Sequence, residues 1–320
     1  MKTYIDLHIH STASDGTLSP SEIVKSAIHM INKEKNSPIA LAEGTENTPG
    51  ICKTQRNPNQ AVIALTDHDT TAGLEEFLRE AEKYKDQITA IPGIEISSDY
   101  HGTEIHILGY QIDPAQKTFQ NELKKYRESR DGRNKAIIQK LQKRGFHISM
   151  EELRADHPDE TIARPHIARK LMEKHYVSSV KEAFDQYLAE GRSCYVPRIK
   201  PDVQKAIRLI LENGGIPVLA HLMYDRNLSS AQKNELTAAL KEEGLAGIEA
   251  YYNTYTPAEE AYVLGLARQH GLIVTGGSDF HGENKPHISL FTGQGNMSVP
   301  KTILPDFLAA VKKNTGPLLS

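Results

Sequence analysis

The chain has 320 residues, a length that suits one α/β barrel with an insertion. Its formal net charge of −3 argues against a strongly basic surface, so we expect no DNA-binding face. The two cysteines, Cys52 and Cys194, form no Cys-x-x-Cys motif, and the chain has no run of about 18 apolar residues; we therefore expect a cytoplasmic protein without disulfides or a membrane span.

The chain opens with a short strand over residues 3–7, followed by a helix. Residues 19–22, Ser-Pro-Ser-Glu, form a capping box with proline at the first helical position, so the helix begins there. Residues 32–60 then break the helical pattern, because they are rich in Asn, Thr, Lys, Glu, Pro and Gly and contain no aromatic residue. Such a segment buries little surface, so we interpret 32–60 as a loop insertion, and favour a tolerated surface insertion over an interaction element.

Strand and helix patterns alternate again after the insertion. A strand over 62–66 leads into an amphipathic helix over 73–84, and a strand pair over 88–97 and 103–110 follows. Apolar runs of this length, bounded by turn residues, are typical of buried strands.

Residues 113–200 differ from the rest, because they carry helical patterns with no strand between them. Ser149 and Ser179 each precede a further capping pattern. An all-helical block within an α/β chain indicates an inserted cap domain, here over 113–195. The main helices are expected at 119–144, 165–175 and 180–189.

The alternation resumes after the helical block and continues to the end. The remaining elements are a helix at 203–212, a strand at 216–220, a helix at 231–243, a strand at 247–251, a helix at 257–270, a strand at 272–275 and a closing helix at 307–313. The whole pattern predicts a distorted (βα)7-type barrel formed by residues 1–112 and 196–320, with a helical cap domain inserted.

Imidazole and carboxylate side chains recur at or just after the ends of these apolar runs. They are His8, His10, Asp15, Asp67, His68, Glu95, His106, His221, Asp279 and His281. Side chains at the carboxyl ends of several barrel strands can converge on one pocket. A mixture of imidazole and carboxylate suits Zn, Mn or Fe better than Ca. The competing explanation is that strand-end histidines merely satisfy polar loops, and the ordered set disfavours it.

Four motifs in this order resemble the PHP family, the phosphoesterase domain of polymerases and histidinol phosphatase. They are Asp-Leu-His-Ile-His-Ser at 6–11, Thr-Asp-His-Asp-Thr at 66–70, Gly-Ile-Glu at 93–95 and Gly-Ser-Asp-Phe-His at 277–281. The resemblance covers residues 3–285. The segment 32–60 is a departure, because the family usually has only a few residues there.

The resemblance implies two or three divalent transition metals, manganese before iron or zinc. The implied ligands are His8, His10, Glu95 and Asp279 for the first metal, Glu95, His106 and His221 for the second, and Asp15, His68 and His281 for the third. The implied catalytic residues are His8, His10, Glu95, Asp279 and His281. Glu95 suits a bridging role, because clustered cations need an anion between them. Asp67 is expected to orient an imidazole, and His101 is a competing ligand.

Cap residues are the candidates for binding substrate. Arg130 and Arg133 share a helix face, although a solvated charged face is an equal alternative. Arg164 precedes a proline that suits the first helical position, where anions are favoured. The resemblance implies that the stretch 164–169, Arg-Pro-His-Ile-Ala-Arg, meets substrate phosphate. His166 could donate to a phosphate or protonate a leaving group, or simply pack, and Tyr195 could stack on a base or fill the hinge.

These residues predict a metal-dependent phosphoesterase. The resemblance implies removal of phosphate from nucleoside 3′,5′-bisphosphates or from the 5′ ends of short RNA, by attack of a metal-activated hydroxide. The alternatives are a small-metabolite phosphatase acting on a compound such as histidinol phosphate, a non-catalytic metal- or nucleotide-binding module, and a polymerase-associated proofreading domain. The histidinol-phosphate branch of the family lacks a helical block like 113–200, which disfavours the small-metabolite alternative. The sequence does not determine the oligomeric state.

Overall fold

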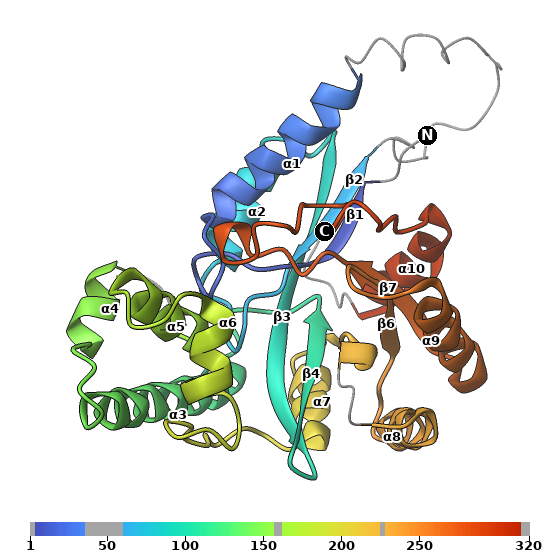
Figure 1. Ribbon diagram of the computed structural model, residues 1–320. Coiled ribbons are helices and arrows are strands. Elements are labelled where there is room, and N and C mark those ends of the chain that lie inside the picture. The colour runs from blue at the N-terminus through green and yellow to red at the C-terminus, as the bar shows by residue number, and fades with distance from the viewer. Residues whose placement is uncertain (1–3, 36–59, 157–161, 225–227, 315–320) are drawn as a thin grey trace, which may run out of the picture.

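The computed structural model describes residues 4–35, 60–156, 162–224 and 228–314 (Figure 1). Its central feature is a seven-stranded sheet in which each strand pairs with the next along the chain. The strands are β1 (Ile5–Ile9), β2 (Ala61–Leu65), β3 (Ile88–Tyr100), β4 (Thr103–Tyr110), β5 (Ile216–Leu219), β6 (Gly247–Tyr252) and β7 (Ile273–Gly277).

The sheet curves until its two edge strands meet. The Asp279 N–H donates to the His8 carbonyl at 2.8 Å, and the His10 N–H donates to the Phe280 carbonyl at 2.9 Å. Close approach at this seam requires glycine, because a Cβ on Gly277 would lie 2.4 Å from the His8 backbone nitrogen. All neighbouring strands are parallel except β4, which is antiparallel to both β3 and β5. The predicted distorted barrel is therefore confirmed.

Helices cover the outside of this barrel (Figure 1). They are α1 (Pro20–Lys35), α2 (Leu74–Glu82), α7 (Val203–Glu212), α8 (Ser230–Glu242), α9 (Pro257–His270) and α10 (Leu304–Asn314). The apolar faces of the first five share one buried cluster with the strands, which includes Ile23, Phe77 and Ile207. A second cluster joins the strands to α10 through Phe307. The sheet is thus packed on both faces, and polar side chains are free to gather at the strand ends.

A separate group of helices lies beside the barrel (Figure 1). These are α3 (Lys117–Gln142), α4 (Met150–Asp156), α5 (Arg164–Glu173), α6 (Val180–Ala183) and the π-helix η2 (Phe184–Leu188). From Ile137 onward they form a hydrophobic cluster of their own, which includes Leu171 and Leu188, whereas the start of α3 packs on the barrel through Phe119 and Leu123. The predicted caps are confirmed, because the Ser149 and Ser179 hydroxyls accept from backbone N–H groups three residues later. The predicted helix over 180–189 is instead an α-helical turn followed by a π-helix.

The start of the predicted insertion was wrong by a few residues. Helix α1 continues through residues 32–35, because lysine and glutamate have good helix propensity even where no apolar face remains. Of the rest of the insertion, 36–59 lie outside the described residues, and Gln60 bonds to the Lys85 carbonyl just before β2. Among the described helices, none combines the length and apolar character needed to cross a bilayer.

Candidate active site

The structure brings together all nine side chains in the predicted ligand set. Most of them lie at or after the carboxyl end of a parallel strand, and His106 joins them because β4 runs antiparallel and starts at the same end of the barrel. Their ligand atoms fall into four overlapping groups, each within 4.8 Å. The groups are His10, Asp15, His68 and His281; His8, Glu95 and His221; His8, His10 and Asp279; and His68, Glu95 and His106.

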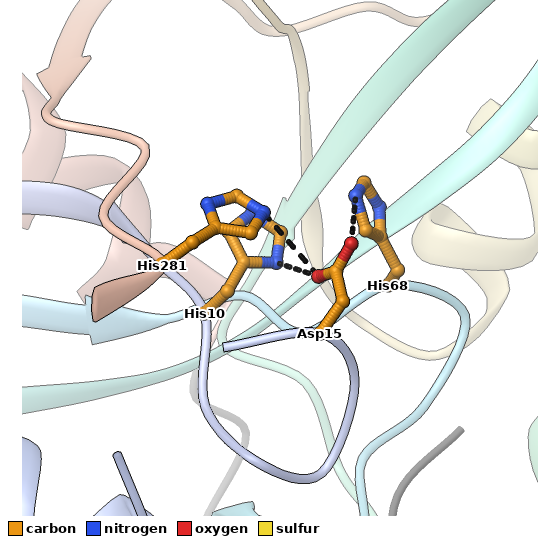
Figure 2. A group of neighbouring side chains, drawn as sticks. All are labelled: His10, Asp15, His68 and His281. Carbon is orange, nitrogen blue, oxygen red and sulfur yellow. Dashed lines mark ion pairs between the residues drawn. The ribbon is translucent and has the colours of Figure 1, made fainter. Parts of the chain in front are cut away.

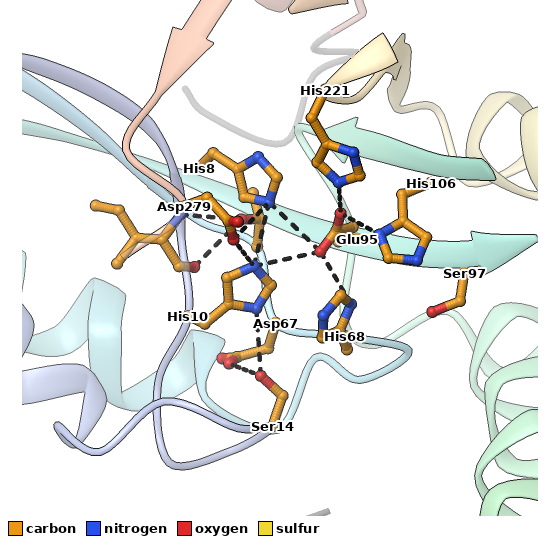
Figure 3. A network of polar contacts seen from close by, with 12 residues as sticks. His8, His10, Ser14, Asp67, His68, Glu95, Ser97, His106, His221 and Asp279 are labelled. Carbon is orange, nitrogen blue, oxygen red and sulfur yellow. Dashed lines mark hydrogen bonds and ion pairs between the residues drawn. The ribbon is translucent and has the colours of Figure 1, made fainter. Parts of the chain in front are cut away.

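Glu95 lies at the centre of the cluster, and its carboxylate is 1 % exposed (Figure 3). Five histidine nitrogens surround its two oxygens. Oε1 lies 2.8 Å from His106 and 3.0 Å from His221, while Oε2 lies 2.9 Å from His68, 3.2 Å from His10 and 3.4 Å from His8. A single carboxylate that contacts this many imidazoles has the position expected of a bridging ligand.

Asp15 organises a second group on the loop after β1 (Figure 2). Its carboxylate oxygens lie 3.3 Å from His281, 3.7 Å from His10 and 4.0 Å from His68. These three histidines come from distant parts of the chain, so the group exists only in the folded barrel.

Asp279 forms the third anionic centre. Its Oδ1 lies 3.3 Å from His10 and 3.7 Å from His8. Its Oδ2 accepts from the Tyr252 hydroxyl at 2.7 Å and from Lys285 at 2.6 Å. The backbone of Asp279 is left-handed, with φ of 54°. Such a conformation in a non-glycine residue is strained, and it is held here by contacts on both carboxylate oxygens.

The ionisation of the cluster reflects its crowding. Burial lowers the pKa of His10, but Asp279 and Glu95 outweigh burial and raise that pKa to about 9. Burial and the charges of Lys285 and His10 lower the pKa of His281 to about 4. Both histidines belong to the group around Asp15. A neutral imidazole such as that of His281 can ligate a metal, and the neighbouring carboxylates attract cations.

The donor set fits divalent transition metals. Nδ1 of His68 and Oε2 of Glu95 are buried without a hydrogen bond, although they lie 2.9 Å apart. A buried polar atom normally has a partner, so atoms that are left over at a cluster of ligands favour a cation between them. Imidazole and carboxylate together are suited to zinc, manganese or iron.

Glu249 supports the cluster and was missed by the sequence analysis. Its carboxylate accepts from the His221 N–H at 2.9 Å and lies 3.0 Å from Nδ1 of His8. A carboxylate on the second nitrogen of an imidazole fixes which nitrogen faces the metal side. The signal was present, because Glu249 is the one charged residue of the apolar strand β6.

Asp67 and His101 belong to none of the four ligand groups. Asp67 does not bond directly to an imidazole, but accepts from the Ser11 N–H at 2.7 Å and from the Ser14 hydroxyl at 2.5 Å. It therefore holds the loop after β1, and the Ser14 hydroxyl in turn lies 3.5 Å from Nδ1 of His10. His101 is exposed at the turn between β3 and β4, against Tyr100, and belongs to none of the four ligand groups.

A cationic wall faces the ligand cluster. Asp69 is buried and accepts from Arg130 at 2.5 Å and from Arg198 at 3.0 Å. Its other oxygen accepts from the Ser97 N–H at 3.0 Å, which ties this wall to β3. Arg198 was missed, because it lies in the irregular segment after the helices and carries no periodic signal. Asp69 thus connects the loop that carries His68 to two arginines from other parts of the chain.

Arg133 lies in the same wall but has no carboxylate within ion-pair distance among the described residues. It is 6 % exposed, and its guanidinium donates to the Asn134 side-chain oxygen. Burial, together with the charges of Arg130, Arg164 and Arg198, lowers its pKa to about 8. At neutral pH this guanidinium is still charged. The wall therefore carries positive charge that a bound anion would neutralise.

Substituting these two arginines should change stability in opposite directions. Arg130→Met removes a partner of buried Asp69 and should destabilise the chain by roughly 2 kcal/mol. Arg133→Met removes an uncompensated buried charge and should stabilise it by about 1 kcal/mol. Urea unfolding in phosphate-free buffer measures both. Equal destabilisation by the two substitutions would show that Arg133 is balanced by charge in the free protein.

Two cavities connect the ligand cluster to the cationic wall. One of about 280 Å³ is lined by Glu95, His221 and Asp279, and another of about 270 Å³ by Asp15, Arg130, Arg133 and Arg198. The residues that line both are His68, Glu104, His106, Arg164, Tyr224 and Lys285.

Of the predicted substrate contacts, Arg130, Arg133 and Arg164 line at least one of these two cavities, whereas His166 and Tyr195 line neither. The guanidinium of Arg164 lies 5.8 Å from the ring centre of Phe184 and 5.9 Å from that of Tyr195, so Tyr195 supports an arginine. His166 is 1 % exposed, and its Nδ1 accepts from the Ala163 N–H at 2.9 Å, which caps α5.

Comparisons with known proteins agree with this geometry. A family model described as PHP domain matches residues 36–235. The 5′-3′ exoribonuclease Rnm of Escherichia coli (strain K12) is 32 % identical over 276 residues, which cover 86 % of this chain and 84 % of that protein. A 3′,5′-nucleoside bisphosphate phosphatase of Chromobacterium violaceum is 31 % identical and covers 87 % of each chain. A crystal structure described as a metal-dependent phosphoesterase from Bifidobacterium adolescentis superimposes with a TM-score of 0.76, at 26 % identity and 96 % coverage of each chain.

Proposed function

The chain belongs to the PHP domain family, and we propose that it is a metal-dependent phosphoesterase that removes phosphate from nucleoside 3′,5′-bisphosphates or from the 5′ ends of short RNA. The observation that carries this proposal is the pair of cavities that share six lining residues, with metal-ligand side chains along one and arginines along the other. Such a space suits a substrate with two phosphates, one at each wall.

The nine clustered side chains would hold two or three divalent metals, and manganese suits their mixture of imidazole and carboxylate. When bound, the metals would lower the pKa of a coordinated water and neutralise charge on the scissile phosphate. Glu249 would orient the His8 imidazole, and Asp67 would hold the loop after β1 in place.

The arginine wall would bind the second phosphate. Arg164 is 23 % exposed and held between two aromatic rings, so its guanidinium is oriented before substrate arrives. Arg133 contributes positive charge that no described carboxylate pairs. Glu104 lies 3.3 Å from Lys200 and 3.8 Å from Arg164, and so balances part of this charge in the free protein.

The helical block would serve as a cap. We place it at 113–195, because its residues from Ile137 to Cys194 form an apolar cluster separate from those of the barrel, and because it supplies Arg130, Arg133 and Arg164 to the cavity. Residues 1–112 and 196–320 would then form the barrel domain. Two cysteines in 320 residues suit the cytoplasm, where we expect the enzyme to act.

Steady-state kinetics with manganese tests the substrate directly. Adenosine 3′,5′-bisphosphate should exceed adenosine 3′-monophosphate by about 10- to 100-fold in kcat/KM, because a desolvated charge-assisted contact contributes roughly 1.5–3 kcal/mol. A 5′-phosphorylated trinucleotide should also be hydrolysed. Faster turnover of histidinol phosphate than of every nucleotide would contradict the substrate proposal and leave the metal chemistry in place.

A further inference from the structure

Tyr224 is an exposed aromatic side chain at the junction of the two cavities. It is 67 % exposed and lines both of them. Among the described residues, the other exposed large apolar side chains are Ile199 and Leu211, and neither lines either cavity. An aromatic ring left open to solvent beside a polar site suggests a surface kept for a flat apolar ligand.

The backbone beneath this ring is fixed. Tyr224 ends the short 3-10 helix η3 (Leu222–Tyr224), and its N–H donates to the His221 carbonyl at 2.8 Å. The Met223 N–H donates to the Tyr255 hydroxyl at 3.1 Å, and Leu222 is 3 % exposed. The turn that leads into Tyr224 is therefore anchored, which lowers the ordering cost of any contact that the Tyr224 ring makes.

The Tyr224 ring already contacts one side chain of the ligand cluster. Tyr224 packs edge-to-face against His221, with ring centres 5.7 Å apart and an interplanar angle of 64°. This contact ties the orientation of the ring to a side chain of the ligand cluster. Arg164 lines the same two cavities, so Tyr224 borders the space between the metal side and the arginine side.

We infer that Tyr224 is the platform on which the nucleobase of the substrate stacks while the two phosphates lie at the ligand cluster and the arginine wall. This inference rests on the proposed function, because it gives a binding site to the nucleobase, which neither phosphate site contacts. Stacking requires only the face of a base, so the platform should accept purines and pyrimidines with little discrimination.

The test compares two substrates that differ only in the base. One is 2′-deoxyadenosine 3′,5′-bisphosphate, and the other is the same sugar bisphosphate with hydrogen in place of adenine. Tyr224→Ala should lower the ratio of their kcat/KM values by about 10- to 100-fold, mainly through KM, since stacking stabilises ground state and transition state alike. Tyr224→Phe should keep the wild-type ratio, because the ring and not the hydroxyl makes the contact.

A second readout is independent of turnover. Calorimetric titration with 2′-deoxyadenosine 5′-monophosphate should show weaker binding to Tyr224→Ala than to wild type. The base-free sugar phosphate should bind both proteins with the same affinity. Ile199→Ala is the matched control, because Ile199 is 75 % exposed and lines neither cavity. It should retain the wild-type ratio.

The outcomes are distinguishable. An active enzyme whose substrate ratio is unaffected by Tyr224→Ala would overturn the platform alone. An equal fall of the ratio in Tyr224→Phe would assign the effect to the hydroxyl and would also overturn it. If the wild type hydrolyses neither bisphosphate, the proposed function fails, and the inference fails with it.

Discussion

Replacing Glu95 with glutamine should lower kcat by about 1,000-fold or more, a change equivalent to about 4 kcal/mol in activation free energy. Glu95 contacts five histidine nitrogens at 2.8–3.4 Å, whereas Asp15 and Asp279 each contact three. The amide has the same size but lacks the charge that would hold neighbouring cations together. Steady-state kinetics on adenosine 3′,5′-bisphosphate with excess manganese measures the loss.

The control for this variant is Glu128→Gln on α3. That carboxylate is 66 % exposed and pairs only with Lys124 among the described residues, at 3.8 Å. Glu128→Gln should keep the wild-type kcat. Both variants should have the same far-ultraviolet circular dichroism spectrum, which shows that both are folded. If Glu95→Gln kept more than about a tenth of wild-type kcat, a loss below roughly 1.4 kcal/mol, Glu95 would not bridge metals.

Replacing Arg164 with alanine should reduce kcat/KM for adenosine 3′,5′-bisphosphate by about 10- to 100-fold, and for the 3′-monophosphate by much less. Arg164 lines both cavities and is already oriented by Phe184 and Tyr195. Its loss therefore removes a contact to the second phosphate, and the preference for the bisphosphate should narrow. The measurement is kcat/KM for both substrates with wild type and variant.

Arg154→Ala is the matched control for charge. Arg154 is 55 % exposed and pairs with Asp131 on the surface of the helical block at 3.3 Å. It should leave both substrates unaffected. Equal losses on the bisphosphate and the monophosphate in Arg164→Ala would instead show that Arg164 serves the scissile phosphate or the fold.

The ligand cluster could be predicted from the sequence because its geometry follows from one rule of the fold. Strands that alternate with helices run parallel, and their carboxyl ends share one edge of the barrel. A histidine or carboxylate at each strand end, such as His8, His68 and His221, must then approach the others. The antiparallel β4 obeys the same logic in reverse, because its early residue His106 lies opposite Ser97 near the end of β3.

The supporting residues could not be found by that rule. Asp69 and Arg198 are 129 positions apart, and they meet because the irregular segment after the helical block passes the loop that follows β2. Lys285 lies in an irregular segment after β7, and its bond to Asp279 depends on the path of that loop. Glu249 was accessible in principle, since a lone carboxylate in an apolar strand must find a buried partner.

Helix positions were predicted well where apolar periodicity was strong, and less well where it faded. Helices α7 and α9 have the predicted bounds, because a capping residue precedes each and glycine follows within two residues of its end. The π-helix η2 was not predicted, because the residues that form it are equally compatible with an α-helix. It matters for the site, since the Leu188 carbonyl accepts from Arg164 at 3.3 Å.

Metal content is the most direct test of the central claim that nine clustered side chains hold a catalytic multi-metal site. Elemental analysis of protein purified without chelator and loaded with manganese should find two or three transition-metal equivalents per chain. Glu95→Gln should retain less than half of them, and Glu128→Gln should retain all. A single tightly bound ion, or none, in wild-type protein that still hydrolyses the bisphosphate would contradict the account.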